Sequence, residues 1–217
     1  MTSLGQRLAA LAAGVAERGL GGPLASGNAS VIDRSSGTLV VTPKGVPFAR
    51  IDARSAVLVR LDESLEVATA LGSPSTELPL HLAAYRACPG ATVVLHLHAP
   101  WTVAASCLRL ERLPLVHYHQ GLLGSVPTPF VPYATPGSLE LAEGVRRALR
   151  GEGDLAAVLL ASHGAVLVGA DERDALELAE ALEDVCRLVV LAGERARLLD
   201  EAELPRLREL FRAYRGR

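Results

Sequence analysis

Hydrophobic positions along the chain follow two spacings, one typical of helices and one typical of strands. Leu4, Leu8, Leu11 and Val15 recur at helical spacing and predict an amphipathic helix over residues 3–18. Similar signals predict helices from the Ser75-Thr76 pair to about Cys88 and over residues 101–108, 137–149 and 171–191, the last being the longest. Runs of β-branched and apolar residues predict strands over residues 31–33, 38–41, 56–59, 92–95, 113–116, 155–160 and 165–168, and around Val126 and Val131. Without repeats or low-complexity linkers, this alternation indicates one α/β domain over residues 1–217, with a hairpin through residues 35–37.

Composition narrows the class of protein. With 217 residues and 49% hydrophobic content, the chain can bury a substantial core. A net charge of −2 argues against a nucleic-acid-binding surface, and the lack of an uninterrupted run of about 18 apolar residues argues against a membrane span. The start lacks the basic-then-apolar order of a signal peptide, so we expect a cytoplasmic protein. Its widely spaced cysteines are then expected to be reduced core thiols: Cys88, Cys107 and Cys186.

The pair His96 and His98 is the first candidate for chemistry. Both follow a run, Thr92 to Leu95, with the composition of a buried strand. Because alternate side chains of a strand share a face, the two imidazoles can grip one cation. An equally simple interpretation is a pair of core histidines that bond backbone carbonyls. The metal hypothesis therefore needs ligands from elsewhere in the chain.

Two further residues could complete such a metal site. His163 lies between two predicted strands, followed by Gly164, where a loop imidazole can point into a cleft. Three histidines leave one position open, as in catalytic zinc sites. Glu77 could supply a fourth ligand or act as a base beside the metal. His81 lies one helical turn after Glu77 on the same face, either packed in the core or supporting the site.

Three predicted loops have the chemistry of anion binding. Two of them hold the residues Gly27, Asn28, Lys44 and Gly45, which include the only asparagine and the only lysine in the chain. The third places the hydroxyls of Ser75 and Thr76 at a helix N-terminus, which attracts phosphate through its free N–H groups. Taken singly, each is an ordinary turn or capping residue, and Glu77 would fit the first helical turn equally well.

Several motifs occur together in an order that carries a family resemblance. They are Ser26-Gly27-Asn28-Ala29-Ser30-Val31, Thr42-Pro43-Lys44-Gly45, Pro74-Ser75-Thr76-Glu77-Leu78-Pro79-Leu80-His81, His96-Leu97-His98-Ala99-Pro100 and Ser162-His163-Gly164. The set resembles the class II aldolase/adducin family and, within it, the L-fuculose-phosphate aldolases. His117-Tyr118, Pro132-Tyr133-Ala134-Thr135 and the tail from Leu204 to Tyr214 strengthen that resemblance.

The resemblance implies a fold and a set of roles. The fold would be a three-layer α/β/α domain around a mixed, largely antiparallel sheet. One zinc ion per subunit, or another divalent metal in its place, would be bound by His96, His98 and His163, with Glu77 completing the shell when substrate is absent. The phosphate of the substrate would be held by Gly27, Asn28, Lys44, Gly45, Ser75 and Thr76. Here Lys44 and Thr76 depart from the hydroxyl residues that are commoner in the family, and both keep a donor. The relatives are homotetramers, in which Tyr118 and the tail (residues 199–217, with Phe211 and Tyr214) would reach the site of an adjacent subunit.

The implied reaction is the cleavage of the C3–C4 bond of a ketose 1-phosphate to dihydroxyacetone phosphate and an aldehyde. Zinc would stabilise the enediolate that forms. Glu77, with a pKa raised in the site, would shuttle the proton at C3, and Tyr118 would handle the proton on the aldehyde-side oxygen. A Schiff-base mechanism needs a lysine, and Lys44 already belongs to a presumed phosphate loop.

Other activities of the same family remain as alternatives. A decarboxylase of a phosphorylated oxo-sugar acid is the first, because it passes through the same kind of enediolate, and a methylthioribulose-phosphate dehydratase is another. The family's epimerases carry an Asp after the position of Tyr118, where this chain has His119 and Gln120. A non-catalytic adducin-like module would have lost metal ligands, and all of them are present here. The roles of His117 and His119 stay open.

Overall fold

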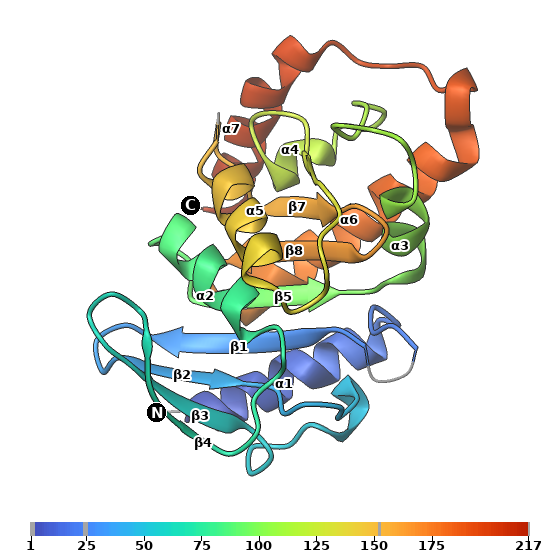
Figure 1. Ribbon diagram of the computed structural model, residues 1–217. Helices are drawn as coiled ribbons and strands as arrows, with labels where there is room; N and C mark the ends of the chain where they lie inside the picture. The colour runs from blue at the N-terminus through green and yellow to red at the C-terminus, as the bar shows by residue number, and fades with distance from the viewer. Residues whose placement is uncertain (1–2, 24–25, 152, 217) are drawn as a thin grey trace.

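A single eight-stranded sheet forms the centre of the computed structural model, which describes residues 3–23, 26–151 and 153–216 (Figure 1). The strands lie in the order β4-β3-β2-β1-β5-β8-β7-β6, and every neighbouring pair is antiparallel except the parallel pair β6 and β7. Their bounds are β1 (Asn28–Asp33), β2 (Thr38–Val41), β3 (Val57–Leu61), β4 (Val67–Leu71), β5 (Val93–Leu97), β6 (Phe130–Val131), β7 (Ala157–Leu160) and β8 (Gly164–Gly169). The expected mixed, largely antiparallel sheet is therefore confirmed.

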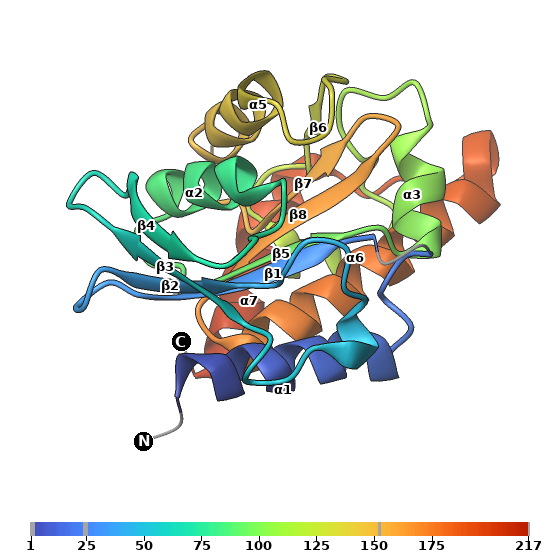
Figure 2. The same cartoon turned by 60° about the horizontal axis from the view of Figure 1, so that its bottom comes forward.

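Helices cover both faces of this sheet (Figure 2). On one face lie α2 (Leu78–Ala87) and α5 (Leu139–Leu149), which pack against each other, and on the other lie α1 (Leu4–Glu17) and α6 (Glu172–Ala192). The remaining helices are η1 (Phe48–Arg50), α3 (Pro100–Ser106), α4 (Gln120–Leu123), η2 (Gly193–Arg195), η3 (Glu201–Glu203) and α7 (Leu204–Arg215). The three layers expected from the resemblance are present.

The alternation of side chains on the central strands determines where the polar residues go. In β5, Val93, Leu95 and Leu97 pack into the apolar core shared with α1 and α6. Val94 packs into the core on the opposite face, and His96 shares its face because strand side chains alternate. In neighbouring β1, the same rule places Ser30 on the α2 side. Polar residues thus interrupt the apolar layer below α2, at the level of the histidine pair.

Two predicted strands are absent from the structure. Residues 113–116 and the segment around Val126 are irregular, and only Phe130–Val131 of this region joins the sheet. Leu113 and Leu115 are nevertheless buried, at 0% and 1% exposure. Their apolar character therefore reflects burial and not pairing with a neighbouring strand. Pro114, between them, has no N–H group to donate to such a strand.

One strand that the sequence did not predict and one cysteine that was expected in the core are both exposed. Strand β4 was not predicted because it lies at the edge of the sheet with four of its five residues exposed, so it lacks the apolar pattern of a buried strand. Cys107 is exposed and is not a core thiol, whereas Cys186 is buried as expected. None of the helices in the described ranges is both long and apolar enough to cross a membrane.

Candidate active site

His96 is fixed by the sheet itself. It lies in β5 between β1 and β8, and its side chain is fully buried. Its Nδ1 atom donates a hydrogen bond of 2.9 Å to the carbonyl oxygen of Ala165 in β8. This bond leaves Nε2 as the ring atom that faces the other candidate ligands.

His98 and His163 approach the same point from two different chain segments. His98 follows directly after β5, and His163 lies in the tight turn between β7 and β8. Ser162 in this turn has a left-handed backbone with φ 54°, which is uncommon for a residue with a side chain. A Cβ at Gly164 would meet the carbonyl oxygen of Leu97 and lie 3.0 Å from the His98 ring, so glycine permits this close approach.

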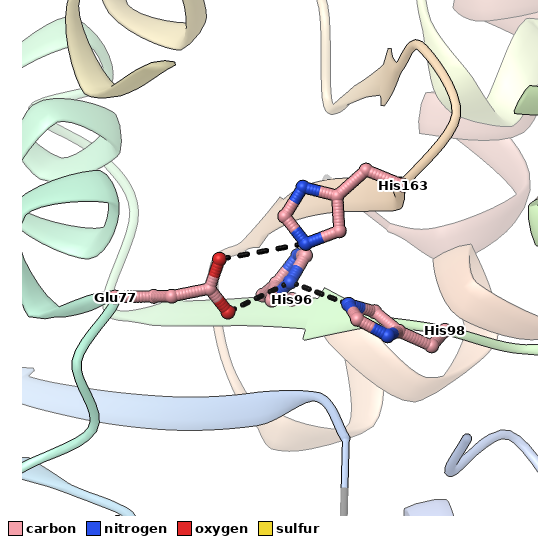
Figure 3. Close-up of side chains that lie close together, drawn as sticks. All are labelled: Glu77, His96, His98 and His163. Carbon is pink, nitrogen blue, oxygen red and sulfur yellow. Dashed lines mark hydrogen bonds and ion pairs between the residues drawn. The ribbon is translucent and has the colours of Figure 1, made fainter. Parts of the chain in front are cut away.

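Glu77 reaches the histidines from the opposite side, directly before α2 (Figure 3). Its Oε2 atom lies 3.0 Å from His96 Nε2, and its Oε1 atom lies 3.5 Å from His163 Nε2. The Nε2 atoms of His96 and His98 are 2.8 Å apart. Four side chains from three parts of the chain therefore converge, with one ligand atom of each within 4.8 Å of the others.

The arrangement fits a divalent cation. In a tetrahedral zinc site with bonds of about 2.1 Å, neighbouring ligand atoms lie about 3.4 Å apart, close to the spacings found here. Glu77 Oε1 is buried and accepts no hydrogen bond within the described chain. Three imidazoles and one carboxylate are also the ligand types that zinc and similar cations select.

The protonation states agree with this interpretation. Burial lowers the pKa of His98 and of His163 to about 4, with a further contribution from the charge of His96, so both rings are neutral and carry a lone pair at neutral pH. Burial alone would raise the pKa of Glu77, but hydrogen bonds from His96 and Asn28 outweigh it and hold the pKa well below its ordinary value. The expectation of a raised pKa for Glu77 is therefore wrong for this state of the site.

A cavity of about 290 Å³ opens beside these ligands. Glu77, His98 and His163 line one part of it. The remaining lining includes every residue predicted to hold phosphate, namely Gly27, Asn28, Lys44, Gly45, Ser75 and Thr76. Three loops that are distant in the sequence therefore meet around one space that adjoins the candidate metal ligands.

Local structure explains how these loops come together. Pro43 and Pro74 form an isolated β-bridge, and the amide N–H groups of Lys44 and Ser75 bond backbone carbonyls of Ser73 and Thr42 across it. Ser75 Oγ accepts a hydrogen bond of 3.2 Å from the Glu77 amide, but Thr76 makes no cap, since α2 begins two residues later than the Ser75-Thr76 pair suggests. The exposed Thr76 hydroxyl thus remains at the cavity.

Asn28 is bound on two sides. Its Nδ2 atom lies 2.9 Å from Glu77 Oε2, and its Oδ1 atom lies 2.5 Å from His81 Nε2. His81 is fully buried, and burial lowers its pKa to about 3, so the ring is neutral. Both interpretations of His81 are thus partly right, because it packs in the core and contacts a residue of the site.

Tyr118 and the tail residues lie together but away from the cavity of their own chain. The rings of Tyr118 and Phe211 are nearly parallel, at 8°, with centroids 6.0 Å apart. Tyr214 is 87% exposed. None of the three lines the cavity that contains Glu77. Their predicted contact with the site of an adjacent subunit stays a prediction.

His117 and His119 form a second group with Asp184 of α6. One ligand atom of each lies within 4.8 Å of the others, and His119 Nδ1 is 3.9 Å from Asp184 Oδ2. Residues 117–119 form a turn rather than a strand. This group is more exposed than the first and has one ligand fewer.

Sequence reasoning missed several residues that lie at the site. Pro136 lines the cavity, and the Pro136-Gly137 turn before α5 was the only available signal. Ser30 and Tyr85 bond each other behind His81, with Ser30 Oγ 3.0 Å from the Tyr85 hydroxyl. A tyrosine hydroxyl inside an apolar helix face was the only hint of that contact.

Comparisons with known proteins agree with this geometry. Residues 6–190 match the model of the family described as the class II aldolase and adducin N-terminal domain, and the chain belongs to that family. It is 33% identical over 189 residues to the 3-oxo-tetronate 4-phosphate decarboxylase of Escherichia coli K12, covering 84% of this chain and 85% of the relative. It is 31% identical over 192 residues to the 5-methylthioribulose-1-phosphate/5-deoxyribulose-1-phosphate aldolase of Escherichia coli O45:K1, covering 87% of this chain and 86% of the relative. A solved structure of L-fuculose 1-phosphate aldolase superposes with a TM-score of 0.85 at 29% identity and covers 98% of both chains.

Proposed function

We propose that the protein is a zinc-dependent class II aldolase that cleaves a ketose 1-phosphate of the L-fuculose 1-phosphate type to dihydroxyacetone phosphate and an aldehyde. The observation that carries the proposal is the shared cavity, in which residues suited to phosphate adjoin four residues suited to a cation. A substrate with a phosphate at C1 and oxygens at C2 and C3 carries a group suited to each of these two parts of the cavity. The aldolase relatives support the same substrate class.

Zinc is one of the divalent cations that three imidazoles and one carboxylate suit. It would be held by His96, His98 and His163, with Glu77 as the fourth ligand before substrate binds. A bound zinc ion supplies Lewis acidity, which polarises a carbonyl and stabilises negative charge on its oxygen.

The protein side chains would perform the proton transfers. Glu77 is ionised in the structure, the state required of a base, and we assign to it the proton at C3. If substrate displaced Glu77 from its place beside His96, the favourable contact with that ring would be lost, and the pKa of Glu77 would rise towards its ordinary value. Tyr118 would exchange the proton on the aldehyde-side oxygen from an adjacent subunit.

The phosphate loops would hold the unreactive end of the substrate. Gly27 has φ +83°, and a Cβ there would lie 2.9 Å from the carbonyl oxygen of His96, so a side chain is excluded at this point of the cavity wall. Backbone N–H groups, the Ser75 and Thr76 hydroxyls and the Lys44 ammonium provide donors for phosphate oxygens. Binding energy gained there would orient the C3–C4 bond for cleavage.

A decarboxylase of a phosphorylated oxo-sugar acid is the second candidate, favoured by the 33% identity to the 3-oxo-tetronate 4-phosphate decarboxylase. Its substrate also carries a phosphate and a ketone, and loss of CO₂ would leave the same three-carbon enediolate. The two activities therefore differ in the second product, which is an aldehyde in one case and CO₂ in the other.

One assay separates these candidates. Purified protein is incubated with L-fuculose 1-phosphate or with 3-oxo-tetronate 4-phosphate, and dihydroxyacetone phosphate is followed with a coupled dehydrogenase. Aldehyde and CO₂ are measured in parallel. We expect dihydroxyacetone phosphate with equimolar aldehyde from the ketose 1-phosphate. Turnover of the oxo acid alone, with CO₂ release, would favour the decarboxylase, and turnover of neither would reject both assignments.

The assembly and location of the protein belong to the same proposal. We infer a cytoplasmic homotetramer in which Tyr118, Phe211 and Tyr214 of one subunit face the cavity of the next. The exposure of Tyr118, at 48%, and of Tyr214, at 87%, leaves both rings available for such a contact. Light scattering of the purified protein tests the assembly, and a monomer with full activity would remove these residues from the site.

A further inference from the structure

His81 lies outside the cavity, yet it is joined to Glu77 through one side chain. Its ring is fully buried between α2 and β1, with Nε2 2.5 Å from Asn28 Oδ1 and Nδ1 2.8 Å from Ser30 Oγ. Asn28 in turn lies 2.9 Å from Glu77 Oε2. Both ring nitrogens of His81 are therefore used, and one of them acts on a residue that contacts the carboxylate.

The carboxylate determines the direction of each hydrogen bond in this series. A carboxylate that serves as a metal ligand is ionised and only accepts, so the Asn28 atom that faces Glu77 must be the NH₂ group. The Asn28 carbonyl then faces His81, and only a proton on His81 Nε2 can satisfy it. Since the ring is neutral, its lone pair lies on Nδ1 and accepts the hydroxyl proton of Ser30.

The far end of the series is anchored in the core. The Tyr85 hydroxyl donates 2.9 Å to the Ser30 carbonyl oxygen and lies 3.0 Å from Ser30 Oγ. Tyr85, Ser30 and His81 are all fully buried. No solvent can replace any of these bonds, so the network holds one set of proton positions from the core to the carboxylate.

We propose that His81 is a positioning residue for Glu77, acting through Asn28. By holding the Asn28 carbonyl, it keeps the Asn28 NH₂ group on the carboxylate. Without that bond the amide could turn over and present its carbonyl oxygen to the carboxylate. The inference rests on the proposed function, in so far as Glu77 is taken as metal ligand and base.

Asn28 also connects the two halves of the cavity. Its amide nitrogen has two hydrogens, of which Glu77 takes one, and the residue lines the cavity beside the phosphate loops. His81 therefore fixes a group that adjoins both the carboxylate and the expected phosphate. A role in core packing alone would require the volume of the ring but neither its Nε2 proton nor its Nδ1 lone pair.

Two variants of matched length separate positioning from packing. In His81→Gln, an amide N–H can reach the position of the Nε2 donor, whereas His81→Met fills similar space without a donor. We expect His81→Met to lower both the zinc affinity, measured by chelator competition, and kcat by about 10- to 100-fold, the usual effect of losing a partner of a metal ligand. His81→Gln should stay close to the wild type. Equal zinc affinity and equal kcat in the two variants would overturn the proposal.

A measurement on the wild type covers the case in which His81→Met does not fold. Long-range ¹⁵N–¹H NMR of the imidazoles should show His81 with its proton on Nε2 and its lone pair on Nδ1. The opposite tautomer would contradict the derived network. If the wild type cleaves neither sugar phosphate, the proposed function fails, and the zinc affinities and the tautomer still decide the positioning role.

Discussion

The Nε2 atoms of His96, in β5, and of His98, directly after it, lie 2.8 Å apart. Nδ1 of His96 donates to the carbonyl oxygen of Ala165, so Nε2 is the ring atom that is left to bind a ligand. A carboxylate oxygen of Glu77 also lies 3.0 Å from this nitrogen. Lone pairs that converge in this way repel each other unless a proton or a cation lies between them. The pair is therefore best understood as one side of a cation site.

Metal content is the first prediction. We expect one tightly bound zinc ion per chain, and His98→Ala should lower its affinity by more than the 10- to 100-fold typical of losing an outer partner. Asp184→Asn alters the more exposed group with His117 and His119, which has one ligand fewer, and is the matched control. It should leave the tight ion in place. If the Asp184→Asn variant lost the tight ion, the ion would be bound by the group of Asp184 and not by Glu77 and the three histidines.

Glu77→Gln should separate binding from turnover. The three histidines still hold the cation, but the amide cannot exchange a proton, so kcat should fall by about 100-fold or more. Zinc content and kcat are measured on the same preparation. Glu66→Gln, a surface carboxylate paired with Arg86, is the control and should keep full turnover. A fully active Glu77→Gln variant would exclude Glu77 as the base.

Lys44→Met should weaken substrate binding more than it slows the reaction. The ammonium lies on the cavity wall in an exposed loop, so its loss should raise KM by about tenfold, the lower end for a charge-assisted bond. The difference from wild type should shrink as salt is added. Arg50→Met removes a nearby exposed charge that does not line the cavity and should leave KM unchanged. Equal KM values for the Lys44 variant and wild type would remove Lys44 from the phosphate site.

The stability of the metal-free protein should depend on pH through His81. Its pKa is about 3 in the folded chain and about 6.5 when unfolded, so between these values only the unfolded chain binds the proton. The free energy of unfolding should therefore fall, as pH decreases below about 6.5, by about 1.4 kcal/mol per pH unit relative to His81→Gln. Above about pH 6.5 the difference should be constant. Urea unfolding of both proteins from pH 7.5 to about pH 5 measures this difference in the free energy of unfolding. A difference that does not change with pH would show that His81 does not titrate in this way.

Gly164→Ala tests the close approach that shapes the turn at His163. A methyl group there would meet the backbone of β5 and the His98 ring, so we expect lower stability and weaker zinc binding. Gly90→Ala, where nothing lies within 4 Å, is the control and should change neither property. Thermal unfolding and chelator competition give the two readouts. A Gly164→Ala variant with unchanged zinc affinity would show that the turn adapts.

The sequence contained enough information to place the central strand and its histidines, because a buried strand has a distinct apolar composition and a strict alternation. It also located the loops with Asn28, Lys44 and Ser75, although only the fold shows that they share one cavity. The missing strand over residues 113–116 shows the limit of the same signal, since burial and strand pairing leave the same apolar pattern. Exposed β4 left no apolar pattern at all.

The direction of the Asn28 amide and the proton positions on His81 lie beyond any sequence pattern. They follow from distances of 2.9 Å to Glu77 and 2.5 Å between the two residues, together with the rule that an ionised carboxylate only accepts. The lowered pKa of Glu77 is a similar case. Burial, which sequence reasoning can anticipate, acts in the opposite direction from the hydrogen bonds that dominate.

We propose that a cation held by Glu77 and three histidines supports cleavage of a ketose 1-phosphate. The most direct test follows dihydroxyacetone phosphate released from L-fuculose 1-phosphate by the purified protein, before chelation, after removal of the metal, and after stoichiometric zinc is restored. We predict that turnover disappears with the metal and returns with zinc. Undiminished turnover by protein shown to be metal-free would exclude a catalytic role of the cation.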